Sequence, residues 1–306
     1  MKLLITAIGK RVQLIKYLKR HFTIVGADCS MLAPASFYVD RFCPVSPCSN
    51  PGYVEEIMDI CRKYEIDIIL PLYEKEFYIL DSARDEFLKN GTFLMLSDRR
   101  VLDICSDKWE TYQFFTRNNI STPKSFINRA ECNIKFPMFI KPRRGMGSCN
   151  SYELNDMEEF NFYYERIPEP IVQEKLSGVE YTMDCISDLQ GKAVSVVPRE
   201  RIEVRAGEVT KTRTVKDMEL IEQTVFLLNK LGSIGPATVQ CFKTVEGEIK
   251  FTEINARVGG GVPLAMEAGI DYGKLFIDLI NGSKPELLLG NFKELTMLRY
   301  DEAVFL

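Results

Sequence analysis

The chain has 306 residues, of which nearly half are apolar and about a quarter are charged, and its formal net charge at pH 7 is −4. This length and composition are those of a globular protein with two or three domains. The slightly negative charge provides no basic footprint for nucleic acid, and no apolar run approaches the length of a membrane span.

The cysteines and the single histidine argue against further classes of protein. Nine cysteines are an odd number, and they are scattered without a C-x-x-C pair. This pattern indicates reduced thiols in a cytoplasm rather than a disulfide framework or a zinc site. The only histidine, His21, is predicted to lie at the surface near the end of a helix. A Ser-His-Asp hydrolase would need this one residue, so we disfavour that class.

The first hundred residues alternate between strand and helix patterns. Residues 2–7 form an apolar run typical of a buried strand, Gly9 interrupts it, and residues 12–18 carry apolar side chains at helical spacing. A second strand over 22–27 completes a βαβ unit, which predicts parallel strands. The other elements predicted here are a loop over 33–51, helices over 53–64 and 77–90, and strands over 66–71 and 92–96. Together they predict a small Rossmann-like α/β domain.

The turn after the first strand does not carry a dinucleotide fingerprint. A nicotinamide site in such a domain needs the pattern G-x-G-x-x-G at this point. In this chain Gly9 stands alone, and Arg11 occupies the place of the second glycine. We therefore expect the domain to have a structural role rather than to bind a dinucleotide.

A basic loop that contains glycine lies near the middle of the chain. The predicted strand over 136–142 contains Lys141 and runs into Arg-Arg-Gly-Met-Gly-Ser at 143–148. Glycines permit unusual backbone angles, and the basic side chains supply charge for phosphates. The spacing does not match the Walker A pattern, so a P-loop fold is disfavoured. A basic hairpin without a ligand is the alternative for this loop.

The second half of the chain is predicted to be rich in strands. From residue 97 on, two helices are predicted within 97–119, with Ser97-Asp98 and Ser106-Asp107 as N-cap candidates and Lys108 opening the second. Further helices are predicted over 155–164, 217–231, 263–267 and 272–281. Further strands are predicted over 170–176, 180–186, 193–204, 208–215, 237–242 and 249–255. The last two form an antiparallel hairpin. Four basic residues on the predicted meander either orient a carboxylate substrate or form a solvated face, namely Arg199, Arg201, Lys211 and Arg213.

The last predicted strand carries the most informative pattern. Glu253 and Asn255 lie two residues apart, so both project from the same face of the strand. Arg257 follows at the turn, and three glycines at 259–261 come next. Oxygen ligands, a cation and bare backbone N–H groups in this order are suited to magnesium and phosphate oxygens. Across the hairpin, Gln240 is placed to face the same cavity.

Taken in order, these pieces resemble the ATP-grasp superfamily, in particular the branch with carbamoyl-phosphate synthetase, biotin carboxylase and the amino-acid ligases. The resemblance covers nearly the whole chain. It is carried by Lys108, Ile140-Lys141-Pro142 with its glycine loop, Gln173-Glu174, Gly178-Val179-Glu180-Tyr181, Gln240 and Glu253-Ile254-Asn255-Ala256-Arg257. It implies a Rossmann-like pre-ATP-grasp domain (1–105), a lid subdomain with a phosphate loop (106–178) and a C-terminal subdomain with the metal site (179–306).

The resemblance also implies roles for individual residues. Lys108 and Lys141 match the lysines that contact the phosphates of ATP, and Arg257 matches the arginine beside the transferred phosphoryl group. Residues 143–148, with Gly145, Met146, Gly147 and Ser148, match the lid over the triphosphate. Glu174, Lys175 and Leu176 match the segment that reads the adenine edge, and Glu180 matches the acid that binds the ribose. The magnesium ligands would be Gln240, Glu253 and Asn255, with Mn²⁺ as an alternative ion.

The implied activity is an ATP- and Mg²⁺-dependent carboxylate–amine ligase that works through an acyl phosphate. The implied partners are small, amino-acid-like carboxylate and amine substrates, with no nucleic acid and no membrane, and a homodimer is an option. Two alternatives remain open: a carbamoyl-phosphate-synthetase-like half that phosphorylates bicarbonate or carbamate, and an ATP-binding protein without turnover. The glycines at 259–261 replace a serine-containing stretch of the synthetase, and we expect them to line the mouth where the second substrate meets the γ-phosphate.

Overall fold

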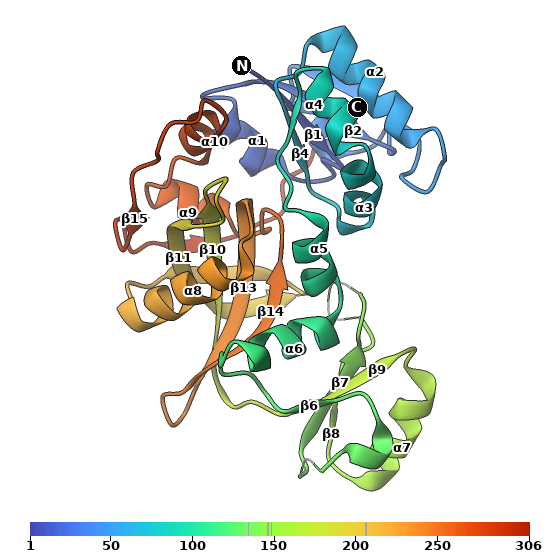
Figure 1. Cartoon of the computed structure of the whole chain (residues 1–306), viewed down its shortest axis with the longest axis vertical. Coiled ribbons are helices and arrows are strands. Elements are labelled where there is room, and N and C mark those ends of the chain that lie inside the picture. Colours follow the sequence, from blue (N-terminus) through green and yellow to red (C-terminus); the bar gives the residue numbers. More distant parts are fainter. Residues whose placement is uncertain (134, 146, 148, 206) are drawn as a thin grey trace.

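The computed structural model describes residues 1–306 with the exception of 134, 146, 148 and 206. Its strands form three sheets, and each sheet takes its strands from one stretch of the chain (Figure 1). The first sheet comes from residues 2–94, the second from 125–174 and the third from 178–298. A parallel sheet followed by antiparallel ones confirms the predicted α/β class.

The N-terminal sheet is parallel throughout, with the strand order β3-β2-β1-β4-β5. Its strands are β1 (Lys2–Thr6), β2 (Thr23–Asp28), β3 (Arg41–Pro44), β4 (Ile68–Pro71) and β5 (Phe93–Leu94). The helices around it are α1 (Val12–Leu18), α2 (Tyr53–Tyr64), α3 (Glu74–Ser82) and α4 (Arg84–Lys89), with a 3-10 turn η1 (Pro34–Phe37). The strand order and the parallel βαβ unit confirm the Rossmann-like prediction.

Two predictions for this domain were wrong in detail. The segment expected to be loop over 33–51 contains β3, a four-residue edge strand with one buried side chain, which is too short for a clear apolar signal. The helix expected over 77–90 is two helices, and the first begins at Glu74. It begins early because the buried Glu76 carboxylate accepts a hydrogen bond from the backbone N–H of Tyr73, at 3.2 Å.

The second sheet is small and antiparallel and carries its own core. Its order is β6-β9-β7-β8, with β6 (Ser125–Phe126), β7 (Met138–Pro142), β8 (Tyr152–Leu154), β9 (Pro170–Glu174), α7 (Met157–Arg166) and the 3-10 turn η2 (Arg129–Glu131). Six buried apolar side chains form this core: Met138, Ile140, Leu154, Phe160, Ile167 and Val172. In Figure 1 this unit projects below the rest of the molecule. We call it the lid.

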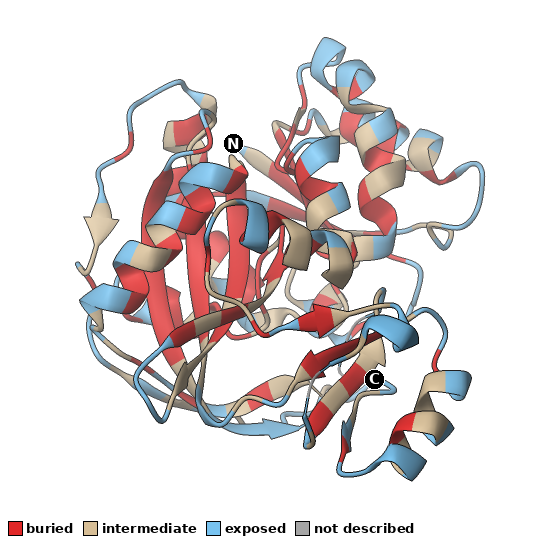
Figure 2. Ribbon diagram, turned by 60° about the horizontal axis from the view of Figure 1, so that its bottom comes forward, coloured by how far each residue is buried: buried red, intermediate tan, exposed pale blue. Residues whose placement is uncertain are grey.

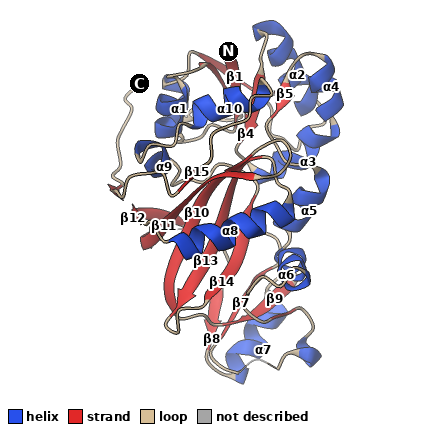
Figure 3. Cartoon of the chain, turned by 60° about the vertical axis from the view of Figure 1, so that its left-hand side comes forward, coloured by secondary structure: helices blue, strands red, loops and turns tan. Residues whose placement is uncertain are grey.

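The third sheet is the largest, in the order β14-β13-β10-β11-β12-β16, with β15 paired to β11. Its strands are β10 (Gly178–Ser187), β11 (Ala193–Arg205), β12 (Glu208–Thr214), β13 (Gly235–Thr244), β14 (Ile249–Asn255), β15 (Leu288–Leu289) and β16 (Thr296–Leu298). Helix α8 (Met218–Leu231) runs across its face (Figure 3), and α9 (Pro263–Glu267) and α10 (Tyr272–Ile280) follow. The hairpin of β13 and β14 is antiparallel, as predicted.

One continuous hydrophobic core joins the first and third sheets. It includes buried side chains of β1, β4, β10, β13 and α10 (Figure 2). Helices α5 (Arg99–Ser106) and α6 (Lys108–Arg117) connect the first sheet to the lid, and Asp98 and Asp107 cap them as predicted. The domain boundaries at 105 and 178 remain a prediction. Within the described part of the chain, no helix is long and apolar enough to cross a membrane.

Candidate active site

A cavity of about 430 Å³ lies between the lid and the large sheet. It collects side chains from β7 and β9 of the lid and from β10, β13 and β14 of the large sheet. Most described residues that the sequence singled out for the site line it, and Arg143 and Arg144 of the loop do not. The residues that line it are Lys108, Lys141, Gly145, Gly147, Glu174, Lys175, Leu176, Glu180, Gln240, Glu253, Asn255 and Arg257. Met146 and Ser148, also predicted, lie outside the described residues.

The predicted metal ligands lie together on the hairpin. Gln240 pairs directly with Glu253 across the two strands, and Asn255 lies two residues further along β14. Among the described residues no group of three or more Asp, Glu, His or Cys side chains could hold a metal. An ion at this place would therefore rely on one carboxylate, two amide oxygens and the oxygens of its ligand. This donor set fits Mg²⁺, which prefers oxygen and needs few protein ligands when phosphates are present.

Lys141 reaches the cavity from β7 in the lid. Its ammonium group lies over the ring of Phe139, 5.8 Å from the ring centroid. Burial is the main cause that lowers the pKa of Lys141, to about 8; the charge of Lys108 acts in the same direction, while Glu253 and Glu180 act in the opposite direction. A bound phosphate would favour the charged form of Lys141, because its oxygens would replace the water that the ammonium group loses on burial.

We expect nucleotide binding by the free protein to weaken as the pH rises through about 8, because Lys141 then loses its charge. Lys141→Arg should remove this dependence, since a guanidinium stays protonated. The measurement is the Kd of a non-hydrolysable ATP analogue by calorimetry, between about pH 6.5 and about pH 9.5. Lys135→Arg, a matched change at an exposed position just before β7, should keep the wild-type profile. An unchanged profile in Lys141→Arg would contradict the assignment.

Arg257 is oriented by the N-terminal domain. Its Nε lies 2.8 Å from Oε1 of Glu74, the first residue of α3. Glu74 is not among the residues predicted from the sequence to belong to the site. A signal was available, because Glu74 follows the carboxyl end of β4, and ligands of parallel α/β sheets bind at that edge. The N-terminal domain thus orients the guanidinium group of Arg257 in the cavity.

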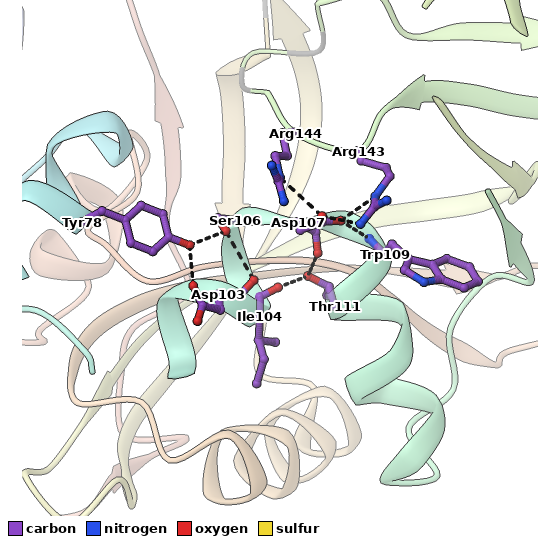
Figure 4. Close-up of polar contacts among 9 residues, drawn as sticks. All are labelled: Tyr78, Asp103, Ile104, Ser106, Asp107, Trp109, Thr111, Arg143 and Arg144. Atoms are coloured by element: carbon purple, nitrogen blue, oxygen red, sulfur yellow. Dashed lines mark hydrogen bonds and ion pairs between the residues drawn. The ribbon is translucent and has the colours of Figure 1, made fainter. Parts of the chain in front are cut away.

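The base of the lid loop is held by Asp107, as Figure 4 shows. Arg143 donates two hydrogen bonds to this carboxylate, at 3.1 and 2.6 Å, and Arg144 lies 3.4 Å from it. Burial acts to raise the pKa of Asp107, but the hydrogen bonds from Arg143 and from the Trp109 amide, with the arginine charges, bring it below its usual value. Both loop arginines thus approach Asp107, and the charge that they would supply to phosphates stays a prediction.

Lys108 ties the same loop to α6. Its backbone N–H donates to the carbonyl oxygen of Arg143 at 3.0 Å, and its Nζ donates to that of Gly145 at 3.1 Å. Lys108 therefore contacts the loop and the cavity at once.

The predicted adenine and ribose residues take part in ion pairs. Lys250 pairs with Glu174, and Lys175 pairs with Glu153 across the lid. Glu180 lies 3.0 Å from Nε of Arg201, which also lines the cavity. The other meander cations do not line it: Arg199 is buried against Asp184, Lys211 pairs with Glu203, and Arg213 pairs with Glu200.

The glycines at 259–261 are needed for close packing. A Cβ at Gly261 would overlap the guanidinium of Arg199, and one at Gly260 would lie 2.7 Å from Nη1 of Arg11. Neither glycine has the positive φ that would itself demand glycine. The segment thus forms a flat platform for two arginines, and its expected place at the mouth of the site stays a prediction. Gly259 and Gly260 line a second cavity, next to the first.

Comparison with protein families agrees with this geometry. Residues 3–95 match the PylC-like N-terminal domain, and residues 105–261, just over half of the chain, match the ATP-grasp domain. The chain belongs to the ATP-grasp family. Its resemblance to the carbamoyl-phosphate synthetase, biotin carboxylase and ligase branch is confirmed by its relatives.

Two curated relatives and one solved structure illustrate how this ATP-grasp protein is related to others. It is 24% identical over 259 residues to the carbamoyl phosphate synthase large chain of Clostridium beijerinckii, covering 77% of this chain and 24% of the relative. It is 24% identical over 196 residues to the D-alanine–D-alanine ligase of Bacillus velezensis, covering 56% of this chain and 54% of the ligase. The chain thus spans about half or less of the length of these relatives.

The solved structure is the biotin carboxylase domain dimer of the Hydrogenobacter thermophilus 2-oxoglutarate carboxylase, in complex with MgADP, ADP and bicarbonate. Its TM-score is 0.76 at 16% sequence identity, covering 93% of this chain and 71% of that one. At this identity the likeness shows the fold alone, and it confirms the predicted ATP-grasp architecture.

Proposed function

We propose that this ATP-grasp protein is an ATP- and Mg²⁺-dependent ligase that joins a carboxylate to an amine through an acyl phosphate. One observation carries the proposal: Lys141 of the lid and Glu253, Asn255 and Arg257 of the large sheet line one cavity. Lysine and arginine beside oxygen ligands suit phosphoryl transfer, which depends on positioning and charge neutralisation.

The reaction would proceed in two displacements. An oxygen of the substrate carboxylate attacks the γ-phosphorus of ATP, which forms the acyl phosphate and releases ADP. The amine nitrogen then attacks the acyl carbon, phosphate leaves, and the nitrogen gives up a proton to form the amide. Lys141 and Arg257 would stabilise the charge on the transferring group, and Glu74 would hold Arg257 in position.

Gln240, Glu253 and Asn255 would hold Mg²⁺. When bound, the ion neutralises charge on the phosphate oxygens. Glu253 has a second part in this proposal, because its charge favours the protonated form of Lys141. The lid loop, anchored through Asp107 and Lys108, would exclude water from the acyl phosphate, which water would otherwise hydrolyse.

The nucleotide base would lie against the end of β9. The backbone N–H of Glu174 already donates to the carbonyl oxygen of Lys124, at 3.0 Å. The adenine edge would be read by the backbone of Glu174, Lys175 and Leu176, with the Glu174 N–H already engaged by Lys124. Glu180 would bind the ribose hydroxyls while paired with Arg201.

The test is a screen for ADP and phosphate release with ATP and Mg²⁺, over amino acids and other carboxylates with and without an amine, with product masses measured. A product whose mass is the sum of acid and amine less one water supports the ligase. Replacement of Mg²⁺ by Mn²⁺ in the same screen tests the alternative ion. If no carboxylate releases ADP, the proposal is overturned.

A second candidate function is favoured by the match to carbamoyl phosphate synthase. In that case bicarbonate or carbamate would be phosphorylated in the same cavity. ADP release that depends on bicarbonate and not on an amino acid would select it. Tight ATP binding without ADP across the whole panel would select a binding protein without turnover.

The remaining predictions concern the setting of the site. The biotin carboxylase domain is described as a dimer, and a homodimer of this chain stays a proposal that sedimentation would test. Domain limits at 1–105, 106–178 and 179–306 are likewise proposed, as is a cytoplasmic location.

A further inference from the structure

A second and larger cavity, of about 1370 Å³, adjoins the cavity between the lid and the large sheet, which we call the nucleotide cavity. The two share a wall: Arg257 lines the nucleotide cavity, and Val258, Gly259 and Gly260 line the larger one. The larger cavity also receives residues from the start of α1, from β12 and from the segment after β16. A molecule in the larger cavity would thus lie close to Arg257, which in the proposed function contacts the γ-phosphate of ATP.

Three cations in this cavity surround a single carboxylate. Glu208 lies 3.4 Å from Nζ of Lys10, 3.3 Å from Nη1 of Arg11 and 3.1 Å from Nη1 of Arg299. One carboxylate balances one of these charges, so the group carries a surplus of two positive charges. Burial lowers the pKa of Arg11, and the neighbouring charges of Arg257 and Arg299 act in the same direction, against the attraction of Glu208.

Arg11 has a donor that the described residues do not satisfy. Its Nη1 is shielded from solvent and makes no hydrogen bond in the part of the chain that the structure describes, although Glu208 is within ion-pair distance. The guanidinium packs against Gly260, where a side chain would displace it. A buried donor without an acceptor is costly unless a ligand supplies one.

Among the described residues, no acid other than Glu208 forms an ion pair with Lys10, Arg11 or Arg299. Glu267 accepts a hydrogen bond from Tyr17, and Glu203 pairs with Lys211. Asp301 and Glu302 are exposed and lie in the segment beyond β16. The wall also carries Lys16, Arg20 and Arg205. The positive group around Glu208 therefore keeps its attraction for an anion.

We propose that the larger cavity holds a substrate with two anionic groups, and that Lys10, Arg11 and Arg299 bind the group that does not react. We call these three residues the anion clamp. The reacting carboxylate would then point along Gly260 towards Arg257, and the second group, a carboxylate or a phosphate, would compete with Glu208 for the clamp. This inference rests on the ligase function proposed above and names its substrate class.

The test compares acids with their uncharged isosteres. Calorimetry on the whole chain, with a non-hydrolysable ATP analogue and Mg²⁺ present, would use glutamate against glutamine and aspartate against asparagine. Phosphoserine against serine is the phosphate arm, and it distinguishes a phosphate from a carboxylate as the second group. At least one acidic member should bind at least about tenfold more tightly than its partner, as expected for a charge-assisted hydrogen bond. ADP release should show the same preference.

Arg299→Gln and Arg11→Gln should each remove most of this preference while leaving the affinity for the ATP analogue within about twofold. Arg213→Gln, an exposed arginine on β12 that lines neither cavity, should keep it. Equal binding of acids and isosteres by the wild type, or an intact preference in both clamp variants, would overturn the clamp. If clamp-dependent binding is present but no acid releases ADP, the ligase function fails and the clamp stands.

Discussion

Glu253→Gln is expected to abolish Mg²⁺-dependent ADP formation, with a loss of about a thousandfold or more. The substitution removes the only carboxylate among the three predicted metal ligands and leaves the amides of Gln240 and Asn255. It also removes a charge that favours the protonated form of Lys141, so the pKa of that lysine should fall below its present value of about 8. Both effects would weaken the binding of the γ-phosphate, the first through the metal ion and the second through Lys141.

ADP release at saturating Mg²⁺ measures this loss, and calorimetry with and without Mg²⁺ separates ion binding from nucleotide binding. The fold should persist, because glutamine keeps the shape of this half-buried side chain, which forms no ion pair with the described residues of the cavity wall. Glu246→Gln, in the exposed turn of the same hairpin, should retain wild-type activity. Wild-type activity in Glu253→Gln would remove this residue from the metal site.

Asp184→Ala is expected to be the most destabilising single change, at about 3–5 kcal/mol. Asp184 and Arg199 are both almost fully buried, and their side chains are 2.6 Å apart at Oδ2 and Nε. The variant leaves a buried guanidinium without its counter-charge. Because Gly261 packs directly on this guanidinium, the platform at 259–261 should be disturbed as well.

Urea denaturation followed by far-ultraviolet circular dichroism would measure the change. Glu203→Ala removes one member of an exposed ion pair on β11, the strand that carries Arg199, and should lower the free energy of unfolding by less than about 1 kcal/mol. Replacement of both buried partners, Asp184→Leu with Arg199→Met, should recover much of the stability, since no buried charge then remains. A loss below about 1 kcal/mol in Asp184→Ala would contradict the argument.

The sequence predicted the elements that carry the site, because strand alternation and cap residues are local signals. Glu253 and Asn255 share a face by strand geometry alone, and Gln240 faces them because a short turn fixes the hairpin. Lys108 was found as the first residue of α6 because Asp107 caps that helix. The resemblance to the ATP-grasp family then supplied roles that local patterns cannot give.

What the sequence could not supply were contacts between distant segments. Glu74 and Arg257 are 183 residues apart, and Arg299 and Glu208 are 91 apart. Nothing local indicates which acid meets which base. The packing of Gly260 and Gly261 could not be foreseen for the same reason: the arginines that need their bare backbone are Arg11, just before α1, and Arg199 of β11.

The separate core of the lid has a consequence for how the protein unfolds. Six side chains stabilise the lid, whereas one core joins the first and third sheets although the lid sequence lies between them. The cooperative units therefore do not follow the order of the chain: residues near both ends melt together, and the middle can open alone. Partial unfolding of the middle would expose the nucleotide cavity without disturbing the anion clamp. A nucleotide bound as proposed would contact both units and would therefore couple their unfolding.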